Sequence, residues 1–177
     1  MSFEPFIVTA ELPPDIFSWA DGLRRAHYPV ERNHLEAHVT LFHSLAPSLL
    51  AEIKPLLARL AGEFAAPDAR ITGLMDLGRG TALAIDCPAM LDLRAQIADH
   101  FHGALTSQDS HAPRLHITVQ NKVTAQEASV LKRQLAVAGV ERRFRFAGLG
   151  LHLYRGGPWE ALGRWSFRGA SRGKSGG

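Results

Sequence analysis

The order of predicted strands and helices occurs twice along the chain, and this repetition constrains the fold more than any other feature of the sequence. Alternation of apolar and polar residues predicts strands, and apolar residues at helical spacing predict helices. The first half is predicted to run strand, helix, strand, helix, strand, over residues 3–12, 14–27, 35–45, 48–64 and 69–77. The second half is predicted to repeat this order and add a final strand, over residues 81–87, 88–105, 114–122, 124–138, 144–154 and 159–167. Pro14 and Pro88 each open a helix and lie 74 residues apart, so a duplicated unit is the simplest explanation.

Duplicated units commonly pack about a pseudo-two-fold axis, and equivalent strands then meet across a shared cleft. We therefore expect one two-lobed domain over residues 1–168, with halves at about 1–78 and 79–168. Residues 169–177 are rich in Gly, Ser, Arg and Lys and are expected to form a disordered basic tail.

Composition favours a compact domain in a reducing compartment. With 177 residues and 46% hydrophobic content, the chain has ample material for a buried core. Cys87 is the only cysteine, so no internal disulfide can form, and we expect a cytoplasmic protein. The N-terminus does not resemble a signal peptide, and no apolar run approaches the roughly 20 residues of a membrane-spanning helix. We expect no membrane association and a monomer.

Positive charge is concentrated toward the C-terminus. Eight basic residues and one acidic residue lie from Arg142 onward, so the rest of the chain is net acidic although the formal charge of the whole is +3. A basic end suits a phosphate-bearing partner, whereas a solvated face is the alternative interpretation.

The middle strand of each half carries the same short motif. One reads His38-Val39-Thr40-Leu41 and the other His116-Ile117-Thr118-Val119, which is His, apolar, Thr, apolar in both cases. Side chains of a strand alternate between its faces, so each histidine shares a face with its threonine, opposite an apolar face that packs on helices. Two such strands facing each other would place two imidazoles and two hydroxyls around one small polar ligand.

This arrangement suits phosphodiester chemistry. A neutral imidazole can take a proton from the attacking oxygen, and a protonated one can give a proton to the departing oxygen. Threonine hydroxyls can donate hydrogen bonds to the non-bridging oxygens of the phosphate. We expect His38 and His116 to be catalytic and Thr40 and Thr118 to bind substrate, with no metal or other cofactor. The sequence does not decide which histidine is the acid and which the base.

On these residues the chain resembles the 2H phosphoesterase superfamily and, within it, the bacterial 2′–5′ RNA ligase and RNA 2′,3′-cyclic phosphodiesterase group. The resemblance spans about residues 3–168, with two His-x-Thr strands roughly eighty residues apart in a duplicated frame. It implies an α+β fold with two pseudo-symmetric lobes, each an antiparallel sheet with helices on the outside, around a central cleft. It also implies metal-independent hydrolysis of cyclic phosphates on RNA ends or nucleotides to a 2′-phosphate, with weak reversible 2′–5′ ligation.

Three further residues are candidates for substrate binding. Phe42 and Gln120 lie on the histidine faces by alternation, where Phe42 could stack a base and Gln120 could bind phosphate or base. Lys122 also falls on the site side and could meet a phosphate. For each, the alternative is a structural role in the core or on the surface. His152 lies on a late strand near the basic end, where base or phosphate contact is a further hypothesis.

Two other classes of function remain open. A non-catalytic module could hold an RNA end or nucleotide in the same cleft, although Arg and Lys would suffice for binding alone. A histidine-ligated metal hydrolase is the other alternative, and it is disfavoured because no paired carboxylates lie near the motifs.

Overall fold

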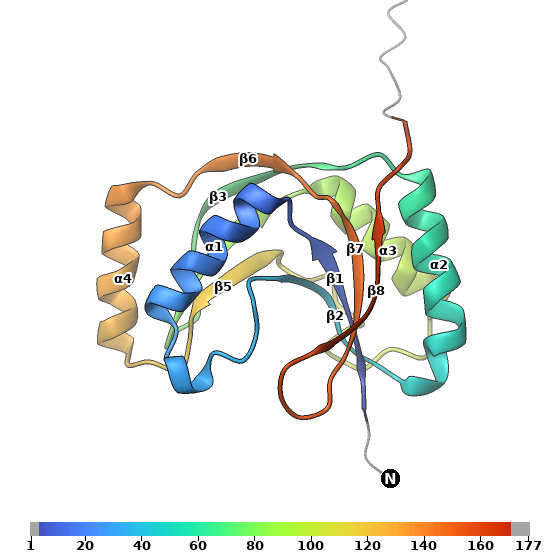
Figure 1. Ribbon diagram of the computed structural model, residues 1–177, viewed down its shortest axis with the longest axis horizontal. Helices are drawn as coiled ribbons and strands as arrows, with labels where there is room; N and C mark the ends of the chain where they lie inside the picture. The colour runs from blue at the N-terminus through green and yellow to red at the C-terminus, as the bar shows by residue number, and fades with distance from the viewer. Residues whose placement is uncertain (1–3, 171–177) are drawn as a thin grey trace, which may run out of the picture.

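Two four-stranded antiparallel sheets form the framework of the molecule. The computed structural model describes residues 4–170 (Figure 1). Sheet A has the strand order β2 (Val39–Leu45), β1 (Phe6–Glu11), β7 (Gly148–Leu153) and β8 (Glu160–Ser166). Sheet B has the strand order β5 (His116–Gln120), β4 (Thr81–Asp86), β3 (Asp68–Asp76) and β6 (Arg142–Arg145). The predicted α+β class with two antiparallel sheets is confirmed.

Four helices accompany the sheets, and their starts follow simple rules. They are α1 (Pro14–His27), α2 (Leu50–Glu63), α3 (Pro88–His100) and α4 (Ala125–Ala138). Pro14 and Pro88 occupy the first turn, where a missing N–H leaves no hydrogen bond unmade. Thr124 caps α4 through its hydroxyl, which accepts a hydrogen bond from the backbone N–H of Glu127 at 3.1 Å. Figure 1 shows α4 and α2 at opposite ends of the molecule; α4 contacts β3 and β4, while α2 contacts β7 and β8.

The predicted order of elements is confirmed with one exception. The single strand predicted over residues 144–154 is wrong, because this segment forms β6 in sheet B and β7 in sheet A. The chain changes sheets at Phe146 and Ala147, whose N–H groups donate to the carbonyls of Pro67 and Glu11. The pattern of apolar residues continues without a break from β6 to β7. Periodicity alone therefore does not show where the chain passes from one sheet to the other.

Each sheet takes strands from both halves of the sequence. Strands β7 and β8 pair beside β1, whereas β3 leaves the first half to pair with β4. The predicted boundary between residues 78 and 79 therefore falls in the turn that joins β3 to β4 within sheet B, where Leu77 N–H donates to the carbonyl of Gly80. The internal duplication stays a prediction.

One hydrophobic core joins the two sheets. It contains fully buried residues of sheet A, such as Val8 and Leu41, together with Leu83 and Ile117 of sheet B. Within residues 4–170, no helix is both long and apolar enough to cross a membrane.

The predicted C-terminal tail is described only in part. Gly169 N–H donates to the carbonyl of Phe64 at 3.0 Å, so this residue packs at the end of α2 rather than in a disordered tail. Residues 171–177 lie outside the described residues.

Candidate active site

The two motif strands lie next to each other at the junction of the sheets. Strand β2 is an edge of sheet A, and β5 is an edge of sheet B. The two strands contact each other in the interior of the arch that Figure 1 shows. His116 is close enough to His38 for its charge to lower the pKa of His38. The structure thus brings the two predicted catalytic histidines together.

Both imidazoles are anchored in the same way. His38 Nδ1 lies 2.7 Å from the carbonyl oxygen of Glu36, and His116 Nδ1 lies 2.6 Å from the carbonyl oxygen of Arg114. A carbonyl oxygen only accepts, so Nδ1 carries the hydrogen in each ring. The other nitrogen, Nε2, is left free to accept or donate a proton. Each motif histidine therefore bonds to the backbone two residues before it, as expected of equivalent positions.

The surroundings of His38 favour its neutral form. Burial lowers its pKa from the ordinary value near 6.5 to about 4, against the opposing effect of the hydrogen bond with Glu36. The charges of Arg24, His152 and His116 contribute to this lowering. At neutral pH the free Nε2 of His38 is thus a proton acceptor.

Thr40 and Thr118 are partly buried on the motif strands, two residues after each histidine. Thr40 pairs with Thr9 of β1, and Thr118 pairs with Ala82 of β4. Between histidine and threonine the strands are regular, so alternation keeps each pair on one face.

Phe42 and Gln120 leave the site face, contrary to prediction. Between Thr40 and Phe42 the register of β2 against β1 shifts by one residue, and between Thr118 and Gln120 the register of β5 against β4 shifts in the same way. A bulge of this kind places two consecutive residues on one side of the strand, so the alternation predicted beyond each threonine is reversed.

Both residues are consequently buried. Phe42 has an exposed fraction of 0% and packs under the guanidinium of Arg94, which lies 4.1 Å from the ring centroid. Gln120 is 5% exposed, and its Oε1 lies 3.5 Å from the Thr81 hydroxyl. Neither side chain is available to a ligand.

Lys122 lies in the turn after β5. Its side chain is exposed and its backbone has a φ of 61°, in the left-handed region. Its predicted contact with phosphate stays a prediction.

A pocket of about 560 Å³ opens beside His38 over the inner face of sheet A. Trp159, which precedes β8, covers His38 with a ring-centroid distance of 4.6 Å and lies 5.4 Å from the ring of His152. The other residues that line the pocket come from β1, α1, the segment before His38, and β7 and β8: Thr9, Ala10, Glu11, Leu12, Pro14, Phe17, His34, Leu35, Glu36, Ala37, Pro158, Ala161 and Arg164.

Sequence reasoning missed most of the polar part of this pocket. His152 was singled out, but Thr9, Glu11 and Arg164 were not. His152 Nε2 lies 3.0 Å from the Thr9 hydroxyl, and both His152 and Arg164 lie 3.8 Å from Glu11 Oε1. Thr9 and Glu11 could have been predicted from the alternation of side chains in β1. This alternation puts both residues on the face of sheet A that carries Thr40.

A buried arginine of α1 holds the two halves of the site together. Arg24 is 3% exposed, and its Nη1 donates to the carbonyl of Thr118 at 2.9 Å. Its Nε donates to the carbonyl of Leu35 at 3.0 Å, just before the first motif. One guanidinium thus links the second motif strand to the segment that leads into the first.

The free edge of β2 is held from the other half in a similar way. Arg94 of α3 donates to the carbonyl of Leu41 at 3.2 Å. The buried carboxylate of Asp109 accepts hydrogen bonds from the N–H groups of His43 and Ser44, both at 2.8 Å. These contacts satisfy backbone groups that an edge strand otherwise leaves open.

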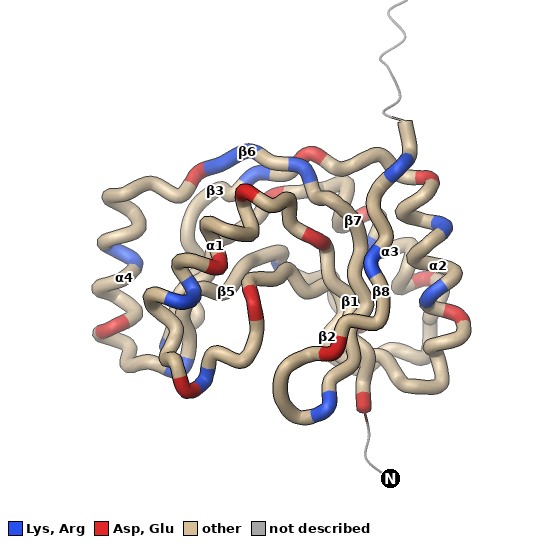
Figure 2. The backbone as a smooth tube through the Cα atoms, in the orientation of Figure 1, with Lys and Arg blue, Asp and Glu red and all other residues tan. Residues whose placement is uncertain are grey.

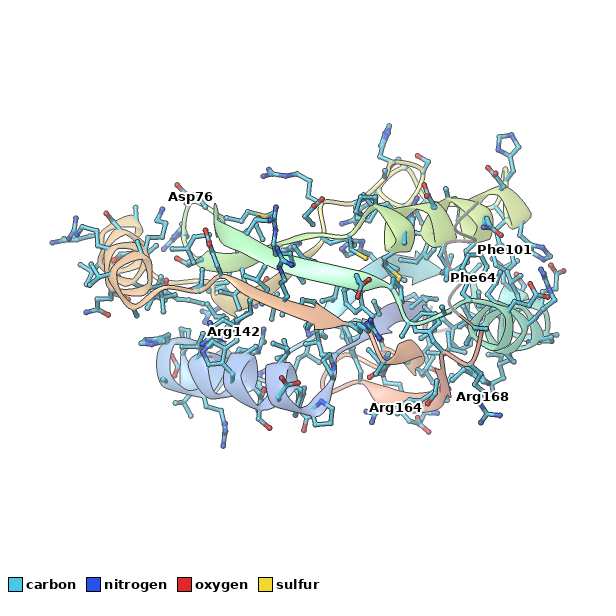
Figure 3. All side chains as sticks on the ribbon, turned by 90° about the horizontal axis from the view of Figure 1, so that it is seen from above. Phe64, Asp76, Phe101, Arg142, Arg164 and Arg168 are labelled. Atoms are coloured by element: carbon cyan, nitrogen blue, oxygen red, sulfur yellow. The ribbon has the colours of Figure 1, made fainter. Side chains whose placement is uncertain are left out.

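The basic residues of the described C-terminal part lie on β6, in the β7–β8 loop, on β8 and just after β8, as the blue segments of Figure 2 show. Arg142 packs over the ring of Trp19 on α1 at 3.5 Å from the centroid, and Figure 3 shows it beside that helix. Arg145 pairs with Asp68 at 2.8 Å, and Arg155 pairs with Glu160 at 3.2 Å. These arginines are therefore engaged within the chain.

Nothing in the described part of the chain gathers three or more His, Cys, Asp or Glu side chains in a way that could hold a metal ion. The buried thiol of Cys87 instead donates to the carbonyl of Asp68 at 3.3 Å.

Comparison with known families adds the deciding observation. The family model of the 2′-5′ RNA ligase superfamily matches residues 12–158, which is well over half of the chain and includes both motifs. The chain belongs to the 2′-5′ RNA ligase superfamily. Comparison with curated protein sequences finds no match.

Solved structures of this fold agree with the assignment. The crystal structure of TT0787 of Thermus thermophilus has a TM-score of 0.59 and 16% identity, covering 94% of this chain and 100% of the other. E. coli LigT complexed with NADP+ also has a TM-score of 0.59 and 16% identity, covering 94% and 99% of the two chains. A crystal structure of a phosphoesterase has a TM-score of 0.58 and 18% identity, with coverages of 94% and 99%. At these identities the likeness shows the fold, and the superfamily supports an enzyme of the 2H phosphoesterase kind.

Proposed function

We propose that the protein is a metal-independent phosphoesterase that opens the 2′,3′-cyclic phosphate of an RNA end or nucleotide and leaves a 2′-phosphate. The observation that carries this proposal is the pair of neighbouring imidazoles, each held through Nδ1 to the backbone with Nε2 free. Two such groups supply the base and the acid that the reaction requires, and the two threonines supply hydroxyl donors to the phosphate.

The low pKa of His38, about 4 because of burial, supports a division of roles. His38 Nε2 takes a proton from the attacking water while the water oxygen bonds to phosphorus. His116 Nε2 gives a proton to O3′ as the bond between phosphorus and O3′ breaks. The product carries its phosphate on O2′. A 5′-hydroxyl in place of water would form a 2′–5′ linkage by the same proton transfers.

Relatives of this fold support a nucleotide as the ligand. E. coli LigT has been crystallised with NADP+ and with 3′-AMP, the latter structure matching this chain with a TM-score of 0.54 and 18% identity. An RNA end carries the same sugar and phosphate groups.

The test is turnover of an oligoribonucleotide that ends in a 2′,3′-cyclic phosphate, with EDTA present. We expect ring opening by the native protein and a loss of at least about 100-fold in His38→Ala and in His116→Ala. His102→Ala, which removes an exposed histidine just after α3, is the matched control and should keep full activity.

Two results would contradict the proposal. Tight binding of the oligonucleotide without turnover would identify a binding module. Activity that disappears with chelator and returns with a divalent cation would identify a metal hydrolase.

A further inference from the structure

The inner faces of the two sheets differ beside the two motifs. In sheet A, Thr9 pairs with Thr40, and Glu11, two residues further along β1 on the same face, lines the pocket together with His38. In sheet B, the corresponding residues are Ala82, which pairs with Thr118, and Ala84, which pairs with His116. Of these neighbours of the motif residues, those in sheet A are polar or charged, whereas those in sheet B are alanines. If a phosphate lies between the histidines, the rest of a bound nucleotide finds hydrogen-bonding partners over sheet A.

The carboxylate of Glu11 is held on this face by three neighbours. The Thr9 hydroxyl donates to its Oε1 at 3.3 Å, and His152 Nε2 and Arg164 Nε both lie 3.8 Å from the same oxygen. No group in residues 4–170 donates a hydrogen bond to Oε2, although Glu11 lines the pocket. Each carboxylate oxygen can accept two hydrogen bonds, and the Thr9 hydroxyl uses one of the two sites of Oε1. Both sites of Oε2 and one site of Oε1 thus remain available to a ligand.

A glycine makes room for this arrangement. Gly150 of β7 pairs with Thr9, and a Cβ added at Gly150 would overlap Glu11 Oε1. The carboxylate therefore leans over β7, away from β2. Adjacent strands are about 4.8 Å apart, so the carboxylate lies roughly two strand spacings, about 10 Å, from the motif strand. A ribose and a base fill a span of this size.

Glu11 is an anion at neutral pH. Burial alone would raise its pKa, but the nearby His152, the charge of Arg164 and the hydrogen bond from Thr9 outweigh burial and lower the pKa below its ordinary value. An ionised carboxylate only accepts hydrogen bonds.

We propose that Glu11 reads the base of the nucleotide that carries the cyclic phosphate and selects guanine. This inference rests on the proposed function. Guanine presents two adjacent donors, N1–H and the N2 amino group, which match the two oxygens of one carboxylate. Adenine and cytosine present one amino donor beside an unprotonated ring nitrogen, and uracil presents one donor between two carbonyl oxygens. Each of these bases would leave one carboxylate oxygen facing an acceptor.

The pocket also has walls that suit a flat ring. Trp159 and Phe17 both line it, and aromatic side chains stack on any base. Stacking does not distinguish one base from another, so the selection of guanine over the other bases is assigned to Glu11.

The experiment compares kcat/KM for the 2′,3′-cyclic phosphates of guanosine, adenosine, cytidine and uridine. A bidentate contact of this kind discriminates by about tenfold or more, so the native protein should prefer the guanosine substrate by that factor. Glu11→Gln should lose the preference by slowing the guanosine substrate, with the other three changing less than about threefold. Glu63→Gln, on the exposed face of α2 beside Arg59, is the matched control and should keep the preference.

A second variant guards against a trivial loss of folding. Gly150→Ala keeps Glu11 but displaces its carboxylate, and it should also remove the guanosine preference. Equal rates on all four substrates in the native protein would overturn the inference. So would a uniform loss on all four in Glu11→Gln, because Glu11 would then act through His152 rather than on the base.

Calorimetric binding of guanosine 2′-monophosphate and adenosine 2′-monophosphate separates this inference from the proposed function. Turnover without base preference would leave the function standing and overturn the inference. Absence of turnover, with tighter binding of the guanosine product that Glu11→Gln abolishes, would overturn the function and support the inference. Absence of both turnover and base-dependent binding would overturn both.

Discussion

At the scale of the residue, the two motif histidines share an anchor and differ in their surroundings. Each donates from Nδ1 to a backbone carbonyl two residues earlier, which fixes the same tautomer in both rings. His38 is additionally covered by Trp159 and lies near the charges of Arg24 and His152. These surroundings keep His38 neutral, which suits the base of an acid and base pair.

The titration of His38 is a direct prediction. Its imidazole should take up a proton near pH 4 rather than near pH 6.5, because burial disfavours the charged ring. Trp159→Ala should move this pKa back toward 6.5 by admitting water. The NMR signals of the His38 ring followed against pH measure the pKa in the native protein and in the variant. A native His38 that titrates near 6.5 would refute the assignment of His38 as the base.

The same shift affects stability with a definite sign. The unfolded chain binds a proton at His38 near pH 6.5, while the folded chain binds it only near pH 4. The contribution of neutral His38 to stability is therefore complete above about pH 6.5 and is lost as the pH falls toward 4. Thermal unfolding of the native protein and of His38→Gln, measured over this pH range, tests this prediction. The melting temperature of the native protein should fall by more on acidification than that of the variant.

At the scale of the element, both motifs lie on edge strands. Backbone groups of these strands that have no partner strand accept hydrogen bonds from side chains of other elements or donate hydrogen bonds to them. Arg24 of α1 binds the carbonyl of Thr118 in β5, while Arg94 of α3 binds the carbonyl of Leu41 in β2. Each motif strand is therefore held by a helix from the other half of the sequence. The relative position of the two histidines depends on these contacts as much as on the sheets.

Replacement of Arg24 tests this point. Arg24→Met would leave the carbonyls of Thr118 and Leu35 without their donors, so we expect the free energy of unfolding to fall by about 3 kcal/mol. Arg25→Met, one residue along the same helix with a side chain 72% exposed, should change it by less than about 0.5 kcal/mol. Urea unfolding measures both. Equal effects of the two substitutions would show that Arg24 is not a link between the motif strands.

The sequence predicted the motif strands, the helices and the convergence of the two histidines, because hydrophobic periodicity and proline carry local structure directly. It did not predict the positions of Phe42 and Gln120, because a bulge depends on the register with the partner strand and leaves no mark in alternation. The arginines were also missed. Their signal was a charged residue within an apolar stripe, since Arg24 follows Ile16 and Ala20 at intervals of four, and Arg94 lies between Met90 and Ile97.

At the scale of the whole molecule, the two sheets are interleaved along the chain. Strands β7 and β8 complete sheet A after sheet B has been built, and β3 crosses from the first half to the second. The two crossing segments touch where Phe146 N–H donates to the carbonyl of Pro67. A single core then spans both sheets, so neither half of the sequence contains a complete sheet with its own core.

This interleaving predicts cooperative unfolding. Tryptophan fluorescence reports α1 through Trp19 and the sheet A side through Trp159 and Trp165, while far-UV circular dichroism reports all elements. The two probes should give one coincident transition in urea. Residues 1–78 expressed alone should not fold, because β1 and β2 would lack β7 and β8. Two separate transitions, or a folded fragment, would contradict this description.

The central claim is that one phosphate lies between the Nε2 atoms of His38 and His116. The most direct measurement is a crystal structure of the protein with a nucleoside 2′-monophosphate, the proposed product. We predict that both Nε2 atoms lie within about 3 Å of oxygens on the same phosphate, with the hydroxyls of Thr40 and Thr118 also in hydrogen-bond range. A phosphate that contacts only one of the two rings, or that binds away from both, would contradict the account.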